Sequence, residues 1–261
     1  MGPLLRRPAA VACFALGLLA SACGGAEADR EEDDPEASES AQTTASGQLT
    51  VFGASSQSCS TISVRGLADQ LVGEMMCLRP NLLSPLTPSD NIDLEPEVFP
   101  YLQTPAARAL ETGVARYGKK ITITSALRTL PQQYLLRRWD SRNRCGVRVA
   151  AAVGESNHEP GLAVDIKLMT ATENRKLRAE LAKTGFAWIG AFDPVHFDYK
   201  DATTTDEIGR LSVLAFKRLW NRNNPTAQLA VDDTYDAKVE AKLKLAPAAG
   251  FDVGARCDEA R

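Results

Sequence analysis

The sequence predicts an α+β fold, in which a small antiparallel sheet with flanking helices is followed by a small helical module at the C-terminus. Composition indicates a folded chain, because 44% of the 261 residues are hydrophobic and 24% are charged. Segments with helical spacing of apolar residues are mixed with short alternating runs, in no regular βαβ order. The formal net charge of -3 indicates no general basic surface, so nucleic acid is not an expected partner.

Residues 1–23 are typical of an export signal. Arg6 and Arg7 precede an apolar run over 9–20 that is too short to span a membrane comfortably. Cys23 follows two small residues, as in a bacterial lipoprotein signal, so we expect it to be lipidated; an ordinary cleaved signal peptide is the alternative. Residues 24–48 are acidic and hold few large apolar side chains, which predicts a flexible linker. We therefore expect an exported lipoprotein, anchored to the membrane and facing the periplasm or cell wall.

Four cysteines follow the signal, at Cys59, Cys77, Cys145 and Cys257. An exported chain can oxidise them, and they lack the close paired spacing of a structural zinc site. Three pairings are possible. We prefer a local bridge from Cys59 to Cys77, which leaves Cys145 to join Cys257.

Residues 49–200 are expected to form the main domain. Apolar residues recur every three or four positions in the expected helices and alternate with polar residues in the expected strands. Gly118 and Gly185 end two of the helices, and the proline-rich stretch 80–100 is expected to be irregular. The expected helices cover 66–78, 104–117, 131–139 and 171–183, and the expected strands cover 120–125, 162–168, 186–189 and 195–199.

Polar chemistry is concentrated between residues 154 and 167. His158 and Asp165 lie seven apart, with a Pro-Gly turn and the start of a strand between them. The other histidine of the chain, His196, lies in a second short strand-like run. Two histidines and one aspartate provide three zinc ligands and leave a fourth position for water. The sequence therefore predicts one Zn²⁺ per chain; the structural alternative is two core histidines and two ordinary aspartates.

Three ordered motifs carry a resemblance to a known family. They are Ser125-x-x-Arg128-Thr129 with Gln133, Ser156-x-His158-x-x-Gly161-x-Ala163-x-Asp165, and Asp193-Pro-x-His196-Phe197. Over roughly residues 95–200 the chain resembles the zinc D-alanyl-D-alanine carboxypeptidase and dipeptidase family, which includes L-alanyl-D-glutamate endopeptidases.

The resemblance implies a role for each matched residue. It implies zinc binding by His158, Asp165 and His196, general-base catalysis by Asp193, and substrate binding by Arg128, Gln133 and Ser156. The chemistry agrees, because an arginine in a strand-to-helix bend can hold a carboxylate and a carboxylate near the metal can take a proton from water. A surface ion pair is the alternative for the arginine.

Some positions depart from the family pattern or are expected to be ordinary. Ala126 and Leu127 replace the usual Gly-Tyr, and Asp193-Pro-Val-His196 is closer to the endopeptidase branch than to many carboxypeptidases. Asp198 is expected to be a solvated strand residue. Glu155 and Glu159 are also expected to be solvated, with a supporting role behind the ligands as the alternative.

Residues 201–261 are expected to contain helices over 205–221 and 234–245. This segment resembles a small helical peptidoglycan-binding module, although Asp233 and Asp236 stand where that family usually has glycines. A helical extension that only packs on the main domain is equally compatible with the pattern. In that case Trp220 and Tyr235 are core residues.

Together these features predict an exported zinc metallopeptidase that hydrolyses peptidoglycan stem peptides. A D-alanyl-D-alanine carboxypeptidase is preferred, because Arg128 suits a free C-terminal carboxylate. The alternatives are an L-alanyl-D-glutamate endopeptidase, a processor of free dipeptides, and a non-catalytic peptidoglycan-binding lipoprotein. Asp193 argues against the last, since a binding module needs no general base.

Overall fold

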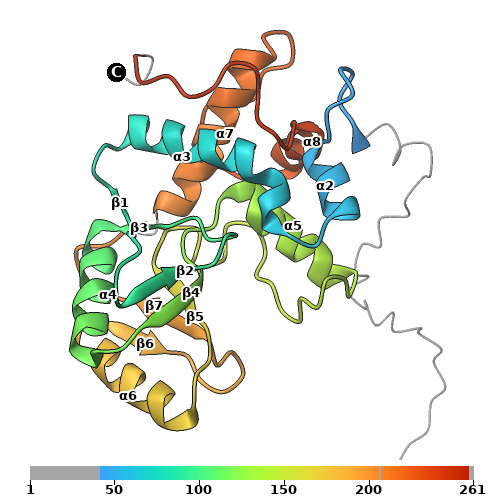
Figure 1. The fold of residues 1–261 in the computed structure, drawn as a ribbon. Helices are drawn as coiled ribbons and strands as arrows, with labels where there is room; N and C mark the ends of the chain where they lie inside the picture. Colours follow the sequence, from blue (N-terminus) through green and yellow to red (C-terminus); the bar gives the residue numbers. More distant parts are fainter. Residues whose placement is uncertain (1–41, 206, 259–261) are drawn as a thin grey trace, which may run out of the picture. The chain divides into compact units, whose positions relative to one another are not determined.

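The computed structural model describes residues 42–205 and 207–258 (Figure 1). The expected export signal, the lipidation site Cys23 and most of the acidic linker lie outside these residues. Among the described residues, no helix combines the length and the apolar character that a membrane span requires.

A five-stranded sheet lies at the centre of the α+β part of the chain. Its order is β2 (Ile92–Leu94), β4 (Ile121–Ser125), β5 (Ala163–Ile166), β7 (His196–Tyr199) and β6 (Phe186–Trp188). Every neighbouring pair is antiparallel except β2 and β4, which are parallel. The short strands β1 (Leu83–Pro85) and β3 (Tyr101–Gln103) form a separate antiparallel pair. The predicted α+β fold with a small antiparallel sheet is confirmed, and β1 and β2 add strands in a stretch that was expected to be irregular.

Helices α4 (Thr104–Tyr117) and α6 (Ala171–Ala182) pack beside this sheet (Figure 1). Leu110 of α4 and Leu181 of α6 are fully buried in the core that they share with the strands. A Cβ placed on Gly113 would lie 2.8 Å from the Leu181 side chain, so this glycine permits the close approach of the two helices. Gly118 ends α4 in the left-handed conformation, with φ of 71°, as the sequence predicted.

The remaining helices share a second apolar core (Figure 1). They are α2 (Val51–Gln57), the 3₁₀ helix η1 (Thr61–Val64), α3 (Arg65–Leu78), α5 (Leu130–Ser141), α7 (Glu207–Asn223) and α8 (Ala237–Leu245). Trp220 is buried beside Phe216 and Phe251, and its indole N–H donates to the Ala227 carbonyl, so it is a core residue. The C-terminal helices therefore pack against elements from the first third of the chain.

A fully buried carboxylate ties α3 to α7 and to the C-terminal segment. Glu74 accepts from Arg218 Nε at 2.6 Å, from Arg222 Nη1 at 3.2 Å and from the backbone N–H of Arg256 at 3.1 Å. Two guanidinium groups and a backbone amide compensate for the loss of water around this charge.

The disulfides join Cys59 to Cys145 and Cys77 to Cys257, so the preferred pairing of Cys59 with Cys77 was wrong. The reason is the rigid helix α3 between them, whose 14 residues extend about 20 Å and hold its two ends apart. Cys145 instead reaches Cys59 through a turn in which Arg144 donates to two backbone carbonyls at the end of α2.

Candidate metal centre

Neighbouring strands place the central side chains in a row across the sheet. Asp165 of β5 is paired in register with His196 of β7 on one side and with Ser125 of β4 on the other. His158 approaches from the loop that precedes β5, where its carbonyl accepts from the backbone N–H groups of Arg128 and Gly161 at 3.0 Å. Gly161 has a φ of +68°, which a glycine adopts without strain and which turns the loop into the strand.

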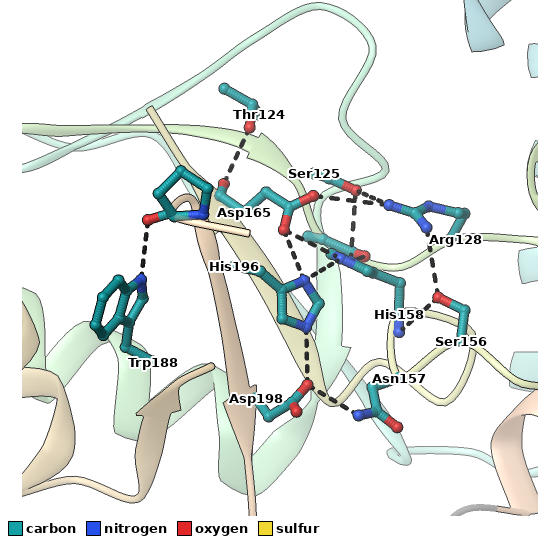
Figure 2. A network of polar contacts seen from close by, with 12 residues as sticks. Thr124, Ser125, Arg128, Ser156, Asn157, His158, Asp165, Trp188, His196 and Asp198 are labelled. Carbon is teal, nitrogen blue, oxygen red and sulfur yellow. Dashed lines mark hydrogen bonds and ion pairs between the residues drawn. The ribbon is translucent and has the colours of Figure 1, made fainter. Parts of the chain in front are cut away.

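His158, Asp165 and His196 converge as the sequence predicted (Figure 2). Asp165 Oδ1 lies 3.3 Å from His158 Nε2 and 2.9 Å from His196 Nδ1, and the two nitrogens are 3.2 Å apart. Ligands of a tetrahedral zinc ion, with bonds of about 2.0–2.1 Å, are about 3.3 Å from one another. The three atoms thus have the spacing of one face of a zinc coordination tetrahedron.

The outer nitrogen of each imidazole has its own acceptor. His158 Nδ1 is 2.8 Å from the Ala126 carbonyl oxygen, and His196 Nε2 is 2.8 Å from Asp198 Oδ1. Histidines that bind metals usually donate their other N–H to a carbonyl or carboxylate in this way, which directs the inner lone pair at the metal. The residues present therefore fit a bound divalent cation.

Asp198 is one of two residues near the site, with Glu159, that were expected to be solvated and are not. Its side chain is only 16% exposed, accepts from the Asn157 side-chain amide at 2.9 Å and contacts His196, so it is not a solvated strand residue. The available signal was strand periodicity, because residues two apart on one strand face the same side.

The pKa values of the two histidines are shifted in opposite directions. Burial, reinforced by the charge of Arg128, lowers the pKa of His158 and favours its neutral form, which is the form that binds metals. Burial of His196 acts in the same direction, but hydrogen bonds to Asp165 and Asp198 outweigh it and raise the pKa of His196 to about 9. Burial of Asp165 is in turn outweighed by its interactions with His158 and His196, which hold its pKa well below the usual range. A metal must therefore displace a proton from His196 at neutral pH.

Arg128 lies beside the metal-binding group and contacts Ser156 (Figure 2) and Gln133, the other two residues predicted to bind substrate. Its Nη1 donates to Gln133 Oε1 at 3.1 Å and to Ser156 Oγ at 3.4 Å, while Nη2 donates to Ser125 Oγ at 3.2 Å. Nη2 also lies 3.7 Å from Asp165 Oδ2, and the arginine side chain is 15% exposed. This guanidinium is held in place by the protein and is not a surface ion pair.

Asp193 lines the same cavity as the three ligand candidates, which has a volume of about 300 Å³. It is half-buried in the turn between β6 and β7, and its carbonyl accepts from the His196 backbone N–H at 3.3 Å. In the described part of the chain its carboxylate contacts neither imidazole, so Asp193 is placed as a cavity-wall group and not as a ligand.

Glu159 is buried, so the expectation that it is solvated was wrong, and it supports the loop that carries Ser156 and His158. Its buried carboxylate accepts from the backbone N–H groups of Gly154 and Ser156 at 2.9–3.2 Å. Burial raises the pKa of Glu159 to about 7, against the opposing effect of those backbone donors. The neighbouring Glu155 is exposed at the cavity rim.

Comparison with known proteins gives limited similarity. No family model matches the chain, and no curated protein matches it significantly. A solved structure of the LD-carboxypeptidase LdcB, described as revealing the molecular basis of peptidoglycan recognition, is 22% identical with a TM-score of 0.38. The match covers 51% of this chain and 72% of that one. We therefore infer function from the geometry of the site itself.

Proposed function

We propose that the chain is an exported, lipid-anchored zinc metallopeptidase that hydrolyses peptidoglycan stem peptides. The supporting observation is the convergence of His158, Asp165 and His196 at 2.9–3.3 Å beside a buried guanidinium. Zinc is the proposed metal because two imidazoles and one carboxylate with an open fourth position are a common catalytic zinc set. The export signal and Cys23 support the proposed location through their sequence pattern alone.

The protein residues have distinct roles in the proposed reaction. When bound, zinc supplies Lewis acidity that polarises the peptide carbonyl and makes water a stronger nucleophile. Asp193, on the cavity wall, accepts the proton of the attacking water and returns it to the leaving amine. His158 and His196 are held in orientation by the Ala126 carbonyl and by Asp198, so they need little rearrangement during the reaction.

Arg128 is suited to bind a substrate carboxylate. Its contacts with the hydroxyls of Ser125 and Ser156, at 3.2 and 3.4 Å, are long for hydrogen bonds. A carboxylate forms shorter and stronger charge-assisted hydrogen bonds with a guanidinium, so it can displace these hydroxyls. Gln133 keeps the arginine in place, because its amide also donates to the Ala151 carbonyl at 2.7 Å.

The preferred substrate is a stem peptide that ends in D-Ala-D-Ala, because a guanidinium beside the metal cavity can recognise the free terminal carboxylate. The Asp193-Pro-Val-His196 turn instead favours cleavage between L-Ala and D-Glu by its resemblance to endopeptidases. In that alternative a carboxyl group of D-Glu occupies Arg128.

The test uses the purified mature protein loaded with zinc, a pentapeptide stem, and the same stem with an amidated C-terminus. We expect release of D-Ala from the free acid alone, loss of release with chelator, and loss in an Arg128→Ala chain that retains zinc. Equal cleavage of both peptides between L-Ala and D-Glu would identify the endopeptidase. No cleavage of wall-derived muropeptides by zinc-loaded protein would refute the peptidase proposal.

A further inference from the structure

A second cavity, of about 220 Å³, adjoins the metal cavity. Arg128, Leu136 and Val147 line both cavities, so the two spaces share a wall. Pockets for whole small ligands usually measure about 300–1,000 Å³. The second cavity therefore has the size for one long side chain of a substrate whose backbone lies in the metal cavity.

The second cavity is lined by apolar and polar side chains and by one carboxylate. Leu127 and Trp139, each 2% exposed, form part of its apolar lining. Glu97 also lines it, and its Oε1 accepts from Ser60 Oγ at 2.9 Å. In the described residues no lysine or arginine forms an ion pair with Glu97. A cavity with partly apolar walls and an exposed carboxylate, Glu97, in its lining can take a side chain with a methylene stem and a terminal ammonium group.

Arg128, which itself lines the cavity, is engaged by Gln133 and Ser125, and a second arginine, Arg65, contacts two residues of the cavity wall. Arg65 donates to the Val98 carbonyl at 3.0 Å, lies 4.3 Å from the centroid of the Phe99 ring and pairs with Asp69 at 3.8 Å. These contacts hold the Arg65 guanidinium against Val98 and Phe99, which line the second cavity. Glu97 is consequently the acidic group of the cavity that is available to an ammonium.

We propose that this cavity is a subsite for a substrate side chain that ends in a primary ammonium group, with Glu97 as the residue that selects it. The inference rests on the proposed function, because it assigns a substrate class to the neighbouring site, and it holds for either scissile bond. Two residues then bind the two charged groups of one substrate: Arg128 binds the carboxylate, and Glu97 binds the ammonium.

Binding is tested with two synthetic pentapeptide stems that differ only at the third residue, lysine or norleucine, so that only the amine is changed. Calorimetry with the zinc-loaded Asp193→Asn chain measures affinity without turnover. We expect the lysine peptide to bind about fivefold more tightly, which is typical of a partly exposed ion pair, and the ratio to fall as salt is added. Glu97→Gln, which keeps an acceptor for Ser60, is expected to reduce the ratio to about one.

Glu95→Gln is the matched control. It removes the same charge two residues away, where Glu95 pairs with Lys167 at 2.9 Å outside the cavity, and it is expected to preserve the lysine preference. Equal affinity for both peptides, absence of binding, or a preference that survives in Glu97→Gln overturns the subsite. A lysine preference in a wild-type chain that cleaves neither peptide would retain the subsite and refute the proposed catalysis, so the two failures are distinguishable.

Discussion

Replacement of Asp198 is expected to weaken metal binding although this residue is not a ligand. Asp198 Oδ1 accepts from His196 Nε2 at 2.8 Å, and its side chain is only 16% exposed, so water screens the contact little. Loss of such a partner typically costs 10- to 100-fold in metal affinity, or about 1.4–2.7 kcal/mol. Asp198 also raises the proton affinity of His196, which competes with the metal. The two effects partly offset each other, so we expect about tenfold weaker zinc binding by Asp198→Ala at pH 7.

The assay is a competition titration of chelator-stripped protein with zinc and a chromophoric chelator. Asp198→Asn retains an oxygen that can accept from His196 but lacks the charge, so its affinity is expected to lie between wild type and Asp198→Ala. Asp193→Asn removes an equal charge from the same cavity without a contact to either imidazole, and is expected to bind zinc as wild type does. If all variants bind zinc within twofold of wild type and remain folded by circular dichroism, the proposed support of His196 is wrong.

Three further outcomes concern stability and connectivity. Non-reducing peptide mapping is expected to find Cys77 linked to Cys257. This disulfide spans 180 residues, and its removal is expected to lower the free energy of unfolding by up to about 5 kcal/mol in denaturant titrations. Glu74→Gln is expected to lower the free energy of unfolding by about 3–5 kcal/mol, because it leaves two guanidinium groups without their buried carboxylate. The control Asp69→Asn removes a carboxylate from an exposed ion pair and is expected to lower it by under about 1 kcal/mol. Gly161→Ala is expected to cost about 1–2 kcal/mol, because alanine is strained at φ of +68°; an unchanged melting temperature would contradict the assigned turn.

Local pattern was sufficient to predict most of the helices and the strands β4 to β7, but not helix α2 or the short strands β1, β2 and β3. The helix over 104–117, for example, has apolar residues at helical spacing and a glycine at its end, and the structure places α4 there. The ligand candidates were also accessible, because the chain has only two histidines and each lies in a recognisable motif. Such features depend on residues within one turn or one strand of each other, so they can be read along the chain.

Contacts between segments that are distant in the sequence could be identified only from the tertiary structure. The pairing of Cys59 with Cys145 depends on a helix that separates Cys59 from Cys77, and the role of Asp198 depends on which face of β7 turns toward His158. The cavity beside Arg128 is likewise built from segments near residues 60, 97, 125 and 139. Periodicity specifies which side chains share a face of one element, but the packing of buried surfaces decides which elements meet, and these partners lie tens of residues apart in the sequence.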